Sequence, residues 1–182
     1  MAKVDIKKML DEAEPTEEFK KLEKFFIGID PSLTGNAIVI INDVGEIIHE
    51  NLISTNKECY INPEQRILDI FDDMDYMFNV VRLQKVYIEG LAYSSNSATL
   101  FERAGLMYLI VTRLLKEDID YSIIVPTMLK KWHTTDGHAD KKFMMRVAKC
   151  KYGIDFQDDN ICDAYCLAML ALEDYQNNIS RD

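Results

Sequence analysis

The sequence changes from charged to apolar at FFIGID (residues 25–30), a short run that ends in a carboxylate. Such a run, followed by turn residues at 31–35, is typical of a buried strand. Residues 37–41 and 46–53 predict two further strands, joined by a hairpin turn at 42–45. We therefore expect these three strands to form an antiparallel meander.

Helices and strands alternate after this meander. Apolar residues at helical spacing predict helices at about 63–81, 98–116, 140–152 and 161–176. Short apolar runs at 86–89 and 123–126 predict two more strands, the second stopped by Pro126. The order indicates an α/β fold with a mixed five-stranded sheet, in which three antiparallel strands are followed by parallel strands and helices flank both.

The composition is that of a folded domain without a membrane segment. The 182 residues are 48% hydrophobic and 10% aromatic, which excludes a disordered or collagen-like chain. No apolar run reaches the roughly 18 residues that a membrane helix needs. The four cysteines show no CxxC spacing, so we interpret them as buried thiols of a reducing, cytoplasmic environment.

The first 24 residues differ from the rest of the chain. They contain six Lys against seven Asp and Glu and few apolar positions, which predicts a charged N-terminal extension before one domain at 25–182. The whole chain has a formal net charge of −10. Taken alone, this charge argues against a nucleic-acid partner.

Two of the predicted strands end in a carboxylate, Asp30 and Glu89. If these strands are parallel neighbours, both side chains lie at the carboxyl edge of the sheet, where α/β proteins place their ligand sites. Considered singly, each residue is more simply a strand-end or capping carboxylate. The pair favours a site.

A third acidic position lies near the start of the last predicted helix. Asp163 is one turn inside a helix that is otherwise apolar, and Asp159 and Asn160 precede it by four and three residues, so either shares its face. N-capping and the helix dipole explain an acid in the first turn. They explain Asp163 poorly.

Carboxylates that converge in one cleft repel each other unless a cation joins them. Oxygen ligands without His or Cys clusters favour Mg²⁺, with Mn²⁺ as a substitute, over zinc. Two such ions would activate a water molecule and stabilise the leaving oxygen of a phosphodiester. The acidic positions therefore predict metal-dependent phosphodiester chemistry.

Four segments resemble the signature segments of RuvC-like Holliday junction resolvases, most of all the phage-encoded branch. They are FIGIDPSLTG, VYIEG, VPTMLKKWHTTDGHADKK and GIDFQDDNICDAYCLAMLA, and together they span about residues 25–172 in order. The resemblance implies an RNase H-like fold of the retroviral integrase superfamily. It also implies a homodimer that makes paired, symmetric, metal-dependent nicks in four-way DNA junctions.

The resemblance assigns the catalytic and metal-binding positions. Asp30 matches the first catalytic aspartate, Glu89 the glutamate and Asp163 the final aspartate. The family usually has Asp or His three residues before that last position, where this chain has the uncharged Asn160. Asp159 is one residue out of register; either it compensates, which we favour, or the site has one carboxylate fewer.

Another departure concerns a turn. The family commonly has a GxG turn, and this chain has Thr135 in place of the first glycine and keeps the second as Gly137.

A basic segment lies between Lys130 and Lys151. Seven Lys and Arg residues face two aspartates there, so the segment carries +5 within a chain of −10. It is either a solvated helix face or a DNA-contacting patch, and we favour the patch because Lys and Arg bind phosphates. The residues expected to contact DNA are Lys130, Lys131, Lys141, Lys142 and Arg146. Lys130 and Lys141 match family lysines near the scissile phosphate, and we include Lys141 among the catalytic residues.

Two further expectations concern the loop after Glu89 and the helix that follows it. Tyr93 lies where relatives carry an aromatic residue, which would stack on bases at the junction centre; an ordinary surface tyrosine is the alternative. The resemblance also implies that the helix at 98–116 packs against its twin in the dimer.

Two other function classes remain open. A protein of this fold with a metal site weakened by Asn160 would bind junctions without cutting them efficiently. A sugar-kinase or actin-type ATPase also opens with a strand that ends in Asp, but it normally needs two such domains.

Overall fold

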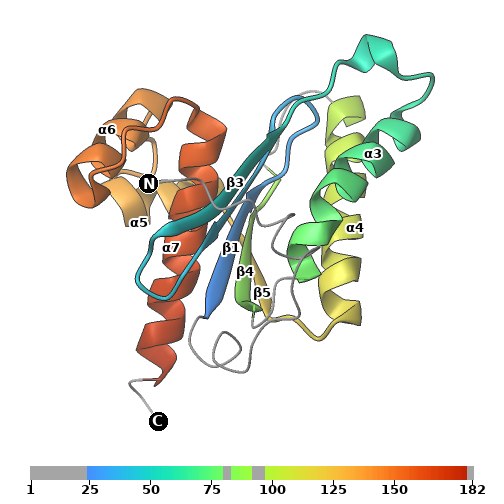
Figure 1. Cartoon of the computed structure of the whole chain (residues 1–182). Helices are drawn as coiled ribbons and strands as arrows, with labels where there is room; N and C mark the ends of the chain where they lie inside the picture. The colour runs from blue at the N-terminus through green and yellow to red at the C-terminus, as the bar shows by residue number, and fades with distance from the viewer. Residues whose placement is uncertain (1–23, 80–82, 92–96, 180–182) are drawn as a thin grey trace.

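The computed structural model describes residues 24–79, 83–91 and 97–179 (Figure 1). It confirms the predicted mixed sheet of five strands, in the order β3-β2-β1-β4-β5. The strands are β1 (Phe25–Asp30), β2 (Asn36–Ile41), β3 (Ile47–Ile53), β4 (Leu83–Glu89) and β5 (Tyr121–Ile124). The first three are antiparallel, and β4 and β5 continue parallel to β1.

Strand β1 lies at the centre of the sheet, and all six of its residues are buried. Its register pairs Ile29 with Ile88 of β4, in parallel. The ends of the two strands therefore lie side by side, as the two carboxylate-terminated apolar runs predicted.

Two layers of helices cover the sheet (Figure 1). Helices α3 (Pro63–Asp75) and α4 (Ser97–Lys116) pack on one face, and Ile27 and Ile29 of β1 point into that core. Helices α5 (Pro126–Thr134), α6 (Lys141–Tyr152) and α7 (Asp159–Ile179) cover the other face. Two short 3-10 helices, η1 (Lys57–Cys59) and η2 (Tyr76–Asn79), flank α3. Within the described ranges, no helix is long and apolar enough to cross a membrane.

Helix α5 was not predicted from the sequence. Pro126 was expected only to stop the preceding strand, but that strand ends at Ile124 and the proline begins a helix. Proline suits the first turn of a helix, because the N–H that it lacks has no partner there and its fixed φ already matches the helix. The Lys-rich segment therefore starts within a regular helix.

Two regions of the sequence analysis fall outside the described residues. These are residues 1–23 of the predicted extension and the loop residue Tyr93. Lys24, the last residue of the extension, lies with its ammonium 4.9 Å from the ring centroid of Tyr175. The division of the chain at residue 25 stays a prediction.

Thr135 caps the C-terminus of α5 in a backbone conformation that is unfavourable for threonine. Its φ is 71°, in the left-handed region, and its N–H donates to Lys131 O as the helix cap. Because a β-branched residue is strained there, we expect Thr135→Gly to raise the free energy of unfolding by about 1 kcal/mol.

A matched substitution tests the effect of backbone strain at positive φ, with the opposite expected change in unfolding free energy. Gly153 caps α6 at φ 74°, and a Cβ built on it meets no atom within 4 Å. Gly153→Ala should therefore lower the unfolding free energy by about 1 kcal/mol through backbone strain alone. Urea titrations of both variants check this, and equal signs would contradict it.

Candidate active site

Two carboxylates meet where β1 and β4 end. Asp30 is the last residue of β1 and Glu89 the last of β4, and their side chains share a hydrogen bond. Asp30 is only 7% exposed. The parallel register of the two strands produces this contact between residues 59 positions apart.

Helix α7 brings the third carboxylate. Asp163 lies one turn into α7 and is 9% exposed. The helix approaches β1 closely because Gly28 has no side chain; a Cβ there would lie 2.5 Å from the backbone nitrogen of Ala168. The close packing places Asp163 near enough to Asp30 for each charge to act on the other.

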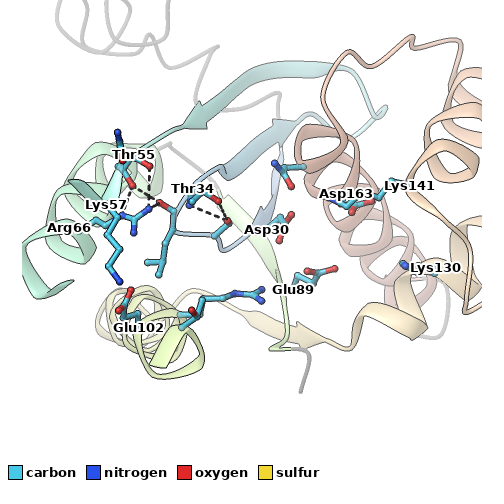
Figure 2. Close-up of a pocket in the computed structure, with 16 residues that line it drawn as sticks. Asp30, Thr34, Thr55, Lys57, Arg66, Glu89, Glu102, Lys130, Lys141 and Asp163 are labelled. Atoms are coloured by element: carbon cyan, nitrogen blue, oxygen red, sulfur yellow. Dashed lines mark hydrogen bonds between the residues drawn. The ribbon is translucent and has the colours of Figure 1, made fainter. Parts of the chain in front are cut away.

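The three carboxylates line one pocket of about 750 Å³ (Figure 2). Asn160, Lys130 and Lys141 line it from the α5–α7 side. Figure 2 shows Asp30 and Glu89 in the middle of the pocket, with Asp163, Lys130 and Lys141 together on one side.

Burial raises the pKa of all three carboxyl groups above its ordinary value. The pKa of Glu89 rises to about 8, from burial first and then from the charge of Asp30. The pKa of Asp163 rises to about 7, again from burial and then from Asp30. The pKa of Asp30 is also raised by burial, against the opposing effects of its hydrogen bond to Glu89 and the positive charge of Arg103. Burial therefore disfavours the charged form of these carboxyl groups, although nearby cations oppose the effect.

The donor set suits a hard divalent cation, since it consists of carboxylate and amide oxygens. The side chains do not enclose an ion as they stand, because no group of three or more His, Cys, Asp or Glu in the described part of the chain converges closely enough. Asp30 and Glu89 instead bond each other, and Asp163 lines the same pocket from α7. A bound cation would offset the cost of burying these carboxylates and their mutual repulsion, which the raised pKa values reflect. The donors are therefore chemically suited to a divalent cation.

Comparisons with known proteins address the whole domain. The family described as "Crossover junction endodeoxyribonuclease RuvC" matches residues 26–171. The chain belongs to the RuvC family. Among curated relatives of that name, the protein of Brachyspira hyodysenteriae is 26% identical over 146 residues, covering 79% of this chain and 90% of the relative. The protein of Caldicellulosiruptor saccharolyticus is 25% identical over 149 residues, covering 79% and 89%.

Solved structures agree on the fold. Thermus thermophilus RuvC in complex with a Holliday junction substrate superposes with a TM-score of 0.70 at 12% identity, covering 86% of this chain and 96% of that one. The yeast mitochondrial Holliday junction resolvase Ydc2 gives 0.52 at 12% identity, covering 85% and 84%. The expected RuvC-like, RNase H-like fold is thus confirmed.

The two alternatives for the fourth ligand differ in position. Asn160 lines the pocket, and its amide nitrogen packs against Gly35. Asp159 forms an ion pair with Lys141, which raises the pKa of that lysine and keeps it charged. Its negative charge still reaches the pocket, since it raises the pKa of both Asp30 and Asp163. That Asp159 compensates for Asn160 stays a prediction.

The basic residues predicted to bind DNA divide into two groups. Lys130 and Lys141 line the pocket beside the acids. Lys131, Lys142 and Arg146 are exposed and do not line it. The guanidinium of Arg146 instead lies over the ring of Phe143, on the outer side of α6.

Three basic residues of the pocket were missed by the sequence analysis: Lys57, Arg66 and Arg103. They precede or lie within α3 and α4, far along the chain from the acidic motifs. The helical spacing of Thr99, Glu102 and Arg103, all in the pocket wall, is the one signal that pointed to a polar face of α4.

Without metal, the protein is expected to lose stability as the pH rises. The pKa values of Glu89 and Asp163, about 8 and about 7, exceed their ordinary values of 4.5 and 3.8, so the folded state keeps protons that the unfolded state has released. The unfolding free energy should therefore fall from pH about 4 to pH about 8. Urea titrations in EDTA measure it, and Asp163→Asn should flatten the profile. A wild-type profile that is flat or rising over this range would contradict the burial of these carboxyl groups as its cause.

Proposed function

We propose that the protein is a metal-dependent, structure-selective endonuclease that resolves four-way DNA junctions as a homodimer, by paired symmetric nicks. One observation carries the proposal: two buried carboxylates and the half-buried Glu89, all of raised pKa, line a pocket together with lysines, in a chain of the RuvC family. Thermus thermophilus RuvC, a structural neighbour, is in complex with a Holliday junction substrate.

The acids of the pocket would bind the metal ions, and the lysines would bind the phosphate. Asp30, Glu89 and Asp163, with Asp159 or Asn160, would hold Mg²⁺, for which Mn²⁺ substitutes. Divalent ions bound there would supply Lewis-acid chemistry, lowering the pKa of the attacking water and stabilising the leaving oxygen. Lys130 and Lys141 would hold the scissile phosphate, since Lys141 stays protonated beside Asp159.

The remaining basic residues would bind the junction arms. Lys131, Lys142 and Arg146 are exposed on α5 and α6, next to the wall of the pocket formed by Lys130 and Lys141. Phosphate contacts of this kind are independent of sequence and weaken as salt is added. Tyr93 is proposed to stack on bases at the junction centre.

An apolar stripe on α4 supports the homodimer. Phe101, Tyr108 and Leu115 are 78%, 64% and 63% exposed, and they follow one another at intervals of seven residues. This spacing places them on one face of the helix. Large apolar side chains in a row on a surface are typical of an interface, and a twin copy of α4 offers a matching stripe.

Tyr108→Glu is therefore expected to give a monomer. A charge in the middle of the stripe opposes its own copy across a two-fold axis, and it is exposed in the monomer, so the fold is kept. Sedimentation should show the change in mass, and the variant should nick one strand without coordinating the second cut. Val44→Glu, at a similarly exposed position on the hairpin turn, is the control. A Tyr108→Glu variant that stays dimeric would place the interface elsewhere.

Nicking of a synthetic junction tests the function as a whole. With Mg²⁺, the wild type should cut a four-way junction at symmetric positions in opposite strands and leave a linear duplex of the same sequence intact. Equal cutting of the duplex would overturn junction selectivity. Binding without nicking in Mg²⁺ or Mn²⁺ would favour the junction-binding alternative, for which the uncharged Asn160 is the specific reason.

A further inference from the structure

The pocket has a second basic wall, opposite the one formed by Lys130 and Lys141. Arg103 of α4 and Lys57 of η1 line it on the side of the sheet covered by α3 and α4. Figure 2 shows Lys57 on one side of Asp30 and Glu89, and Lys130 and Lys141 on the other. The buried acids thus lie between two groups of cations.

The positive charge of Arg103 forms no ion pair with the described residues. Its Nε–H is buried and donates to no hydrogen-bond acceptor among the described residues, and the ion pairs within these ranges do not include it. Its charge nevertheless acts on both Asp30 and Glu89. A guanidinium held at an acid cluster, without a hydrogen bond to it, has donors left for an anion that enters the pocket.

Arg66 has a different role, although it lines the same wall. It is only 4% exposed, and it donates to the carbonyl oxygens of Leu33 and Thr55 and to the Thr55 hydroxyl. These bonds tie the loop after β1 to the segment before η1. Arg66 therefore holds the chain two residues before Lys57, and its Nε and one of its terminal nitrogens are already used in these bonds.

We propose that Arg103 and Lys57 form a second phosphate-binding subsite, which holds the DNA strand on the side of the acid cluster opposite to Lys130 and Lys141. The strand would then cross the carboxyl edge of the sheet, with phosphates held on both sides of the one that is cut. Arg103 would donate two parallel hydrogen bonds to its phosphate, and exposed Lys57 would act as a point charge. This inference rests on the proposed nuclease function.

Salt dependence of binding tests the subsite without any cutting. Junction binding by Arg103→Gln and Lys57→Gln is measured in EDTA over a range of salt concentrations. Each variant loses one phosphate contact in each protomer, so for the proposed homodimer the magnitude of the slope of log K against log salt should fall by about 2. Lys116→Gln, which removes an exposed charge at the far end of α4, should leave the slope unchanged. Unchanged slopes in both pocket variants would overturn the proposal.

Metal binding separates a phosphate contact from a scaffold role. Because the charge of Arg103 opposes a cation at the acid cluster, Arg103→Gln should bind Mn²⁺ roughly three- to tenfold more tightly while it binds and nicks the junction more weakly. Weaker Mn²⁺ binding would show that Arg103 only positions the acids. Arg103→Lys should restore the salt slope but only part of the nicking rate, because it keeps the charge and loses the fork.

The two proposals fail in distinguishable ways. If the wild type binds junctions but never nicks them, the nuclease function is wrong, while the salt slopes still decide the subsite. If Arg103→Gln does not fold, the salt slope of Lys57→Gln decides, since Lys57 is exposed and η1 has no buried residue.

Discussion

Asp30→Asn is expected to abolish junction nicking, with a loss of at least about 10³-fold, or about 4 kcal/mol of transition-state stabilisation. Asp30 interacts with both other acids: it shares a hydrogen bond with Glu89, and its charge raises the pKa of Asp163. Asparagine keeps the shape and one oxygen but removes the charge that a cation needs. Nicking of a synthetic junction in Mg²⁺ and in Mn²⁺ measures the loss.

The same substitution should have the opposite effect on stability and binding. Because burial disfavours the charged form of Asp30, removing that charge should raise the unfolding free energy in EDTA at pH about 8. Junction binding in EDTA should be retained or strengthened, because one negative charge no longer repels the phosphates. Lost nicking together with lost folding or binding would mean that Asp30 supports the structure instead.

Asp43→Asn serves as the matched control. Asp43 is an exposed carboxylate in the hairpin turn between β2 and β3, away from the pocket lining. It should leave nicking, binding and the pH profile of stability unchanged. Asp30→Asn that cuts the junction at the wild-type rate would refute the metal site.

The sheet and the two strand-end acids were predictable because their signals are local. An apolar run that ends in a carboxylate identifies the end of a buried strand, and right-handed crossovers restrict which strands become neighbours. Asp30 and Glu89 follow from these two rules. Asp163 was predicted because it is an acidic residue in an otherwise apolar helix, which packs against the sheet.

The second wall of the pocket was not predictable in this way. Lys57, Arg66 and Arg103 come from η1, α3 and α4, and only the packing of these elements around the end of β1 brings them together. No sequence pattern within any of the three segments indicates that they lie close together in the fold. The choice between Asp159 and Asn160 has the same origin, since adjacent positions of a helix point about 100° apart and the sequence does not fix the rotation of α7.

The net charge was misleading for a related reason. A chain of −10 seems unsuited to DNA, yet its buried acids are in one pocket and basic residues line both walls of that pocket. Charge acts on a ligand through its local arrangement, and composition reports only the sum. Binding should accordingly be confined to this region and be steeply dependent on salt.

Gly28→Ala is expected to destabilise the fold by about 3 kcal/mol or more, although it adds a single methyl group. That methyl carbon would lie 2.5 Å from the nitrogen of Ala168 and closer still to the carbonyl oxygen of Ala164, both backbone atoms of α7. A flexible side chain could turn aside, but a helix backbone must move as a unit. Urea titration measures the loss of unfolding free energy.

Gly105→Ala provides the contrast, because the same chemical change should stabilise. Gly105 lies inside α4, and a Cβ there would be 3.4 Å from the Ile67 Cδ1 atom, an ordinary contact. Alanine should gain about 0.5–1 kcal/mol by its better helix propensity. Equal effects at the two glycines would show that close approach of β1 and α7 is not what matters.

Gly28→Ala should also lower the activity of the molecules that remain folded. Asp163 precedes Ala164 on α7, so a helix pushed away from β1 carries the third carboxylate away from Asp30. Well below the unfolding transition, the folded variant should bind Mn²⁺ more weakly and nick the junction at least about tenfold more slowly, as a displacement of about 1 Å costs when reacting groups must align. Full activity in the folded variant would mean that α7 can shift without disturbing the site. The glycine that lets the helix reach the strand would then serve the fold alone, and the position of Asp163 would have to be set by its other contacts along α7.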